Sequence, residues 1–156
     1  MLFRSGVQLG GAIKNVIAIA CGIVAGRKLG ENARAALMTR GLAETARLGR
    51  AMGANPETFA GLAGLGDLSL TATSTSSRNF RLGLALGQGA SVTEAAAHIT
   101  GVVEGVATAQ AVVALAARYR VDVPISAAVA AIVEHGADIE HTMAGLLARP
   151  FKTETA

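Results

Sequence analysis

Lys14 is the residue of this sequence whose setting most needs an explanation, because its ammonium group stands in an otherwise apolar run from Gly11 to Ala20. Burying an unpaired charge costs several kcal/mol, so the ammonium must reach a partner, a cavity or the surface. A lysine that faces a cavity is suited to general acid–base chemistry. A lysine that snorkels to the surface or pairs with a carboxylate is structural. The residues alone leave both interpretations open.

Two carboxylates also stand in positions where chemistry is plausible. Asp67 follows Gly64 and Gly66, where a backbone without side chains can approach a ligand closely. The same Asp67 is equally suited to an Asx turn or a helix N-cap. Glu104 lies between an apolar pair and Gly105, and its structural alternative is stabilisation of a helix N-terminus.

Ser77, Arg78 and Asn79 form the third group, placed just before a helix predicted to begin near Phe80. Together they offer a hydroxyl, a forked cation and an amide. A helix N-terminus beside an arginine is a suitable site for a phosphate dianion. Capping of the helix by Ser77 or Asn79 is the structural alternative.

The sequence lacks the motifs of several other kinds of binding site. There is no strand–GxGxxG–helix unit for a dinucleotide, no Walker A motif and no HExxH pair. The three histidines are dispersed, which predicts no metal site, and Cys21 lies in an apolar run that predicts a buried structural thiol. The net charge of +3, with scattered Lys and Arg, predicts no nucleic-acid partner.

The apolar stretch from Gln8 to Gly26 nearly reaches membrane-spanning length. Lys14, Asn15 and interrupting glycines indicate a buried core helix instead of a membrane span. Since no signal-peptide pattern opens the sequence, a cytoplasmic protein is expected.

The elements that must position these side chains are predicted to be helices, because the apolar half of the composition is mostly Ala, Leu, Val and Ile, with few aromatic residues. We expect an all-α, multi-helix globular domain over residues 7–149, between a non-native or linker remnant (1–6) and a flexible tail (150–156). A polar, turn-rich ligand-binding stretch is expected at Gly61–Asn79. Caps are suggested by Asn32, Asn55 before Pro56, Ser91 with Glu94, Asp122 before Pro124, and Asp138. The predicted helices are Val7–Ala25, Asn32–Met52, one restarting at Pro56, Phe80–Leu86, Val92–Ile99, Gly105–Arg120, Pro124–His135 and Ile139–Ala148.

Four segments taken together resemble, in order and spacing, the C-terminal domain of bacterial NAD(P)-dependent glycerol-3-phosphate dehydrogenases. The segments are Gly10–Gly22, Gly61–Leu68, Thr73–Asn79 and Val103–Ala109, and the resemblance extends from about Val7 to Arg149. It implies the helical fold shared with the C-terminal domain of 6-phosphogluconate dehydrogenase. It also implies reversible hydride transfer between NAD(P)H and dihydroxyacetone phosphate, which yields sn-glycerol 3-phosphate for glycerophospholipid synthesis.

The resemblance assigns roles to the polar groups. Lys14 matches the family's catalytic lysine, which would protonate or polarise the C2 oxygen as hydride arrives. Asp67 matches a substrate-site carboxylate, and Ser77, Arg78 and Asn79 match a substrate-binding trio whose arginine would bind the phosphate.

Cofactor contacts are implied for Arg78, Val102 and Glu104, while Asn15 and Thr71 are weaker candidates for polar support of the pocket. NAD or NADP would be held mostly by an N-terminal Rossmann domain that this sequence does not include, so the chain alone is predicted to be inactive. The resemblance also makes a homo-oligomer plausible.

Two alternative functions were weighed. One is the helical domain of another 6-phosphogluconate or hydroxyacid-type dehydrogenase, which the order of Lys14, Asp67 and Ser77-Arg78-Asn79 argues against. The other is a non-catalytic helical interaction module, which predicts that Lys14, Asp67 and Arg78 do not converge.

Overall fold

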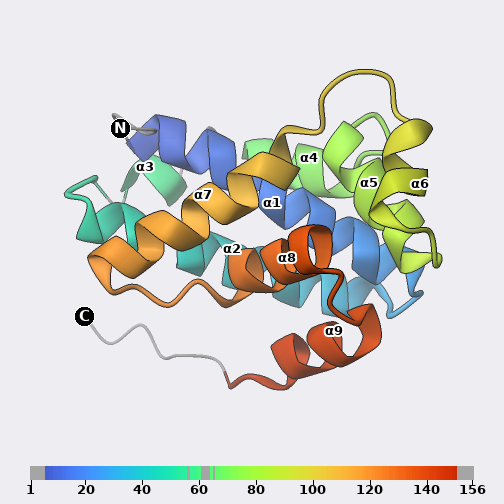
Figure 1. Cartoon of the computed structure of the whole chain (residues 1–156). Coiled ribbons are helices and arrows are strands. Elements are labelled where there is room, and N and C mark those ends of the chain that lie inside the picture. Colours follow the sequence, from blue (N-terminus) through green and yellow to red (C-terminus); the bar gives the residue numbers. More distant parts are fainter. Residues whose placement is uncertain (1–5, 56, 61–63, 65, 151–156) are drawn as a thin grey trace.

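The computed structural model describes residues 6–55, 57–60, 64 and 66–150, and within them the secondary structure is helical, without strands (Figure 1). This confirms the all-α prediction. The helices are α1 (Gly6–Gly26), α2 (Glu31–Ala51), α3 (Glu57–Ala60), α4 (Asp67–Thr73), α5 (Arg78–Gly87), α6 (Val92–Ala97), α7 (Glu104–Tyr119), α8 (Pro124–His135) and α9 (Ile139–Ala148). The expectations for residues 1–5, Pro56 and 151–156 lie outside the described residues.

Helix α1 is the centre of the domain, and α2, α3, α4, α5, α7 and α8 pack against it (Figure 1). It contributes the largest share of the core, including the fully buried Ile13, Ile17 and Ile23. By length and composition α1 could cross a membrane, but 61% of its apolar window is buried inside the domain. That burial is what a core helix requires, and it agrees with the sequence-based interpretation.

Helices α1 and α5 cross at unusually close range because glycines face one another. A Cβ added at Gly22 would lie 2.2 Å from the Phe80 carbonyl oxygen, and one added at Gly83 would lie 2.0 Å from the Ile19 carbonyl oxygen. The same contact repeats one turn further along, between Gly26 and Gly87. Since residue numbers rise together in both helices, the two run parallel. Their spacing and register therefore fix where α1 presents its side chains relative to the start of α5.

Two predicted caps and one predicted turn-rich stretch differ from the structure. The N-cap of α2 is Gly30, without a side-chain hydrogen bond, so Asn32 is not its cap. Asp122 does not cap α8 either, because Val123 holds that position. Within Gly61–Asn79, residues 67–73 form helix α4, so this part is a helix and not the turn-rich stretch expected.

The N-terminus of α8 is instead capped from a distant helix. Glu44 of α2 is fully buried, and its carboxylate accepts hydrogen bonds from the Ile125 amide (2.8 Å), the Ser126 amide (3.0 Å) and the Ser126 hydroxyl (2.7 Å). Burial raises the pKa of Glu44, and these hydrogen bonds oppose the rise. A residue 81 positions before Ile125 thus replaces the local cap, which no short-range pattern reveals.

Other local predictions are confirmed. Ser91 and Glu94 form a reciprocal capping box at α6, Asp138 caps α9, and Asn55 accepts a hydrogen bond from the Glu57 amide. Cys21 is buried, and desolvation raises the pKa of its thiol to about 12, so it is a structural residue.

Candidate functional site

A polar cavity of about 410 Å³ opens where α1, α4, α5 and α7 meet. Most of the polar residues singled out in the sequence face it, although they come from positions up to 90 residues apart. It is lined by Lys14, Asn15, Leu70, Thr71, Ser74, Ser76, Ser77, Arg78, Asn79 and Glu104. The non-catalytic alternative predicted that Lys14 and Arg78 would not converge, whereas both line this cavity.

Lys14 forms an ion pair with Asp67, which is the first residue of α4. The two side chains are 28% and 43% exposed, so the pair lies at the cavity edge and is not deeply buried. An ammonium has three donors and Asp67 takes one of them. The carboxylate thereby orients Lys14, and the remaining N–H groups are free to meet a ligand in the cavity.

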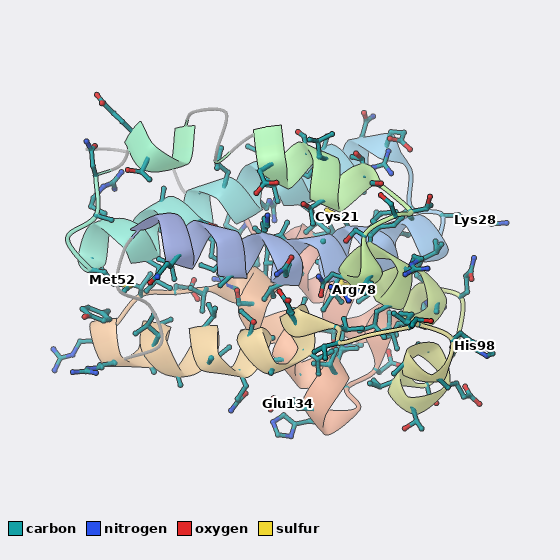
Figure 2. The ribbon with its side chains drawn as sticks, turned by 90° about the horizontal axis from the view of Figure 1, so that it is seen from above. Cys21, Lys28, Met52, Arg78, His98 and Glu134 are labelled. Carbon is teal, nitrogen blue, oxygen red and sulfur yellow. The ribbon has the colours of Figure 1, made fainter. Side chains whose placement is uncertain are left out.

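Arg78 is the first residue of α5 and its side chain is exposed. Figure 2 shows it where α5 begins, beside α1. Among the described residues no carboxylate forms an ion pair with it. Its Nη1 lies against the α6–α7 loop at Gly101, where φ is +95° and an added Cβ would come within 2.5 Å of that nitrogen. The loop backbone therefore supports one side of an uncompensated guanidinium group.

Asn79 is 8% exposed and joins α5 to α7. Its Oδ1 accepts a hydrogen bond from the Gly105 amide at 2.9 Å, which satisfies one of the orphan N–H groups at the start of α7. Because the oxygen is committed, the group that Asn79 can offer to the cavity is its Nδ2 donor. A donor suits an anionic ligand.

Asn15 and Glu104 form a second link across the cavity. The Asn15 Nδ2 donates to Oε2 of Glu104 at 3.3 Å, joining α1 to the first turn of α7. This contact is long and exposed, so its contribution to stability is small. Its main effect is to place both side chains on one wall, next to Lys14.

The hydroxyl groups that line the cavity come from the end of α4 and the turn before α5. Ser77 caps α5 by accepting from the Phe80 amide at 3.3 Å, as the structural alternative predicted. Ser74 and Ser76 hydrogen-bond to each other and were not singled out in the sequence, although the density of Ser and Thr between residues 69 and 77 indicated them.

Two predicted residues lie apart from the cavity lining. Asp67 reaches the site only through its ion pair with Lys14. Val102 stands on the α6–α7 loop and is 72% exposed. Leu70, at the cavity edge, is also 72% exposed, a rare degree of exposure for a large apolar side chain here. No three His, Cys, Asp or Glu side chains gather in the described part of the chain in a way that could hold a metal ion.

The cavity brings together two kinds of polar group. It is lined by the Lys14 ammonium, which its partner carboxylate orients, and by the Arg78 guanidinium, the Asn79 amide donor and serine hydroxyls. Such a cavity fits a small molecule with an anionic group at one end and an oxygen that needs a proton or positive charge at the other.

Comparison with known proteins agrees with this arrangement. A family model described as the NAD-dependent glycerol-3-phosphate dehydrogenase C-terminus matches residues 4–144. The glycerol-3-phosphate dehydrogenase [NAD(P)+] of Rhodospirillum rubrum is 56% identical over 149 residues, which are 96% of this chain and 43% of that protein. That of Cereibacter sphaeroides is 58% identical, over 96% of this chain and 47% of its own length. The chain thus spans less than half the length of these relatives.

Solved structures show the same similarity. The crystal structure of glycerol-3-phosphate dehydrogenase from Coxiella burnetii superposes with a TM-score of 0.89 at 47% identity, over 92% of this chain and 44% of that one. The enzyme from Saccharomyces cerevisiae superposes with a TM-score of 0.83 at 27% identity, over 92% of this chain and 42% of that one. The chain belongs to the NAD-dependent glycerol-3-phosphate dehydrogenase C-terminal family.

Proposed function

We propose that this chain forms the substrate-binding and catalytic-lysine half of a glycerol-3-phosphate dehydrogenase, which interconverts dihydroxyacetone phosphate and sn-glycerol 3-phosphate. The observation that carries the proposal is the shared cavity, in which Lys14 and Arg78 face a space of about 410 Å³ from two helices. Dihydroxyacetone phosphate has the matching polarity, with a phosphate at one end and a reducible carbonyl oxygen nearby.

Lys14 is the proposed catalytic residue. Hydride addition at C2 leaves negative charge on the C2 oxygen, and an N–H of the Lys14 ammonium can stabilise that charge and then transfer a proton to it. Asp67 would hold the ammonium in place through the ion pair. It is also placed to accept a hydrogen bond from a substrate hydroxyl.

The phosphate is assigned to the end of the cavity where α5 begins. Arg78 supplies a planar guanidinium with donors suited to two phosphate oxygens. Asn79 adds its Nδ2 donor, since its oxygen is committed to Gly105. Ser77 can donate its hydroxyl hydrogen while its oxygen caps α5. Thr71 and Asn15 complete the polar wall. Holding the phosphate at this end would position the carbonyl beside Lys14.

NAD or NADP, when bound, would supply the hydride. The residues proposed to touch it are Arg78 and Glu104, which line the cavity, and Val102, which presents an exposed apolar surface on the α6–α7 loop. We assign most of the coenzyme contact to a separate nucleotide-binding domain, because the sequence has no glycine-rich dinucleotide motif. The folded unit over residues 7–149 would therefore be inactive without that domain.

A chimaera tests this function. Residues 7–149 would replace the corresponding C-terminal part of the Coxiella burnetii relative, and oxidation of NADH or NADPH would be followed with dihydroxyacetone phosphate. We expect activity in the chimaera, none in the isolated chain, and a loss of about two to four orders of magnitude in kcat for Lys14→Ala. Arg78→Ala should chiefly raise KM. A Lys14→Ala chimaera as active as its parent would refute the assignment.

Three further proposals rest on the family alone. We place the protein in the cytoplasm, as a homo-oligomer, and acting without a metal ion. Sedimentation of the full enzyme would test the oligomer, and unchanged turnover in the presence of a chelator would support catalysis without a metal.

A further inference from the structure

A second cavity, of about 250 Å³, lies away from the candidate site and has no role in the proposed reaction. It is bounded by α2, the start of α8 and the end of α9, and α9 lies on the opposite side of the domain from α4 (Figure 1). Three guanidinium groups line it, from Arg40 and Arg47 of α2 and from Arg149 just after α9. Arginines converging on a cavity suit recognition of a phosphate or carboxylate.

These arginines are held in position by the surrounding backbone. Nη1 of Arg40 donates to the Leu146 carbonyl oxygen at 2.9 Å, and Nη2 of Arg47 donates to the Asp122 carbonyl oxygen at 3.3 Å. Arg149 pairs with the Asp122 carboxylate. A guanidinium group has five N–H donors, so Arg47 and Arg149 keep donors beyond these bonds. Groups that are already ordered lose little side-chain entropy when a ligand binds.

Arg47 is the residue that most directly indicates an anionic ligand. It is partly buried, its Nη2 donates to a neutral carbonyl, and its Nε is buried without an acceptor among the described residues. The carboxylate of Glu44, one turn earlier on α2, acts on Arg47 only through space because it is committed to the N-terminus of α8. A partly buried cation that makes no ion pair among the described residues, and that has one buried N–H without an acceptor, favours an anion in the adjoining cavity.

The apolar residues that line the second cavity indicate that its ligand also has an apolar part. Ala43 and Pro124 contribute its partly exposed surface, whereas Ile125 and Leu146 belong to the buried core. A bare inorganic ion would leave this surface without a partner. A ligand with a charged head and a short hydrocarbon part would cover both kinds of surface, and the volume restricts it to a small molecule.

We propose that this cavity is a second ligand site, which binds a small amphipathic anion, with its phosphate or carboxylate at Arg47 and Arg149 and its hydrocarbon part against Ala43 and Pro124. The site is separate from the candidate substrate cavity, so the proposal does not depend on the assigned reaction. The two sources of such a head group, a phosphate monoester and a carboxylic acid, differ in charge and are compared directly in the test.

Isothermal titration of the chain with hexyl phosphate, hexanoate and inorganic phosphate is the test. We expect hexyl phosphate or hexanoate to bind once per chain and more tightly than inorganic phosphate. Arg47→Gln and Arg149→Gln should each weaken that binding about tenfold or more, because each removes a charge-assisted hydrogen bond. Arg149 is 45% exposed, so its replacement leaves the fold intact even if Arg47→Gln does not.

One background and one matched variant make the test specific. All titrations are made in Arg78→Ala, because the candidate site around Arg78 is itself proposed to bind a phosphate. Arg50→Gln removes an exposed arginine from the same helix as Arg47 that does not line the second cavity, and it should leave hexyl phosphate binding unchanged. The proposal is overturned if neither amphipathic anion binds, if inorganic phosphate binds equally well, or if Arg50→Gln loses as much affinity as Arg149→Gln.

Discussion

The close crossing of α1 and α5 can be tested by adding a single methyl group. In Gly22→Ala the new Cβ would start 2.2 Å from the Phe80 carbonyl oxygen, 2.7 Å from the Leu84 nitrogen and 2.9 Å from the Gly83 Cα, whereas ordinary contacts lie at 3.4–4 Å. All three neighbours are backbone atoms, so no side-chain rotation relieves the overlap. The helices must separate instead.

The expected cost follows from two opposing effects. Overpacking of this kind costs roughly 1–3 kcal/mol, with the upper end favoured because the backbone itself must move. Replacing a helical glycine by alanine returns up to about 1 kcal/mol. We therefore expect Gly22→Ala to lower the free energy of unfolding by about 2 kcal/mol, which for a domain of this size lowers Tm by roughly 4–8 °C.

Gly11→Ala is the matched control, because Gly11 lies in the same helix and an added Cβ there meets nothing within 4 Å. Only the propensity effect remains, so Gly11→Ala should raise stability by about 0.5–1 kcal/mol. Thermal unfolding followed by circular dichroism at the helix band measures both variants. If Gly22→Ala proves as stable as Gly11→Ala, the helices are not in contact through their backbones and the argument is refuted.

Three further predictions concern single side chains. Because the pKa of Glu44 is raised on folding, its contribution to the free energy of unfolding is fully present below the ordinary value of 4.5 and is lost as pH rises through the higher folded value. Urea unfolding should therefore show stability that declines with rising pH in the parent and a flatter profile in Glu44→Gln. The Cys21 thiol, with its pKa of about 12, should resist iodoacetamide in the folded chain and react on denaturation; equal rates in both states would contradict its burial. Asn79→Asp keeps the acceptor for the Gly105 amide but replaces the Nδ2 donor with negative charge, so the chimaera should stay folded while KM for dihydroxyacetone phosphate rises by about tenfold or more. An unchanged KM would remove Asn79 from the phosphate site.

The features that the sequence predicted correctly depend on residues close together in the chain. Ser91 with Glu94 and Asp138 cap the helices they precede, since a cap needs only three or four adjacent residues. The long apolar run around Cys21 indicated a buried central helix for the same reason. Lys14, Arg78 and Glu104 were singled out because polar groups inside apolar or glycine-rich segments need an explanation, and all three line one cavity.

The features that sequence reasoning missed depend on distant partners. Nothing near Glu44 shows that its carboxylate caps α8, because its acceptor role is fixed only when α2 and α8 pack together. The helical state of residues 67–73 was missed because their Ser and Thr content favours turns, whereas packing of Leu68 and Ala72 into the core supports the helix. The glycines of α1 and α5 likewise allow a close helix contact only because they face one another, which the sequence of either helix alone does not show.

The position of Lys14 on α1 has a consequence for how the protein can fluctuate. Because α1 is the most enclosed helix, its amide protons should exchange with solvent only when the whole domain opens, whereas those of the seven-residue α4 should exchange through smaller openings. The ammonium is thus attached to the slowest-exchanging part of the molecule and its carboxylate partner to a faster one. Ligand entry would then involve excursions of α4 against a stationary α1, and hydrogen–deuterium exchange would resolve the two rates.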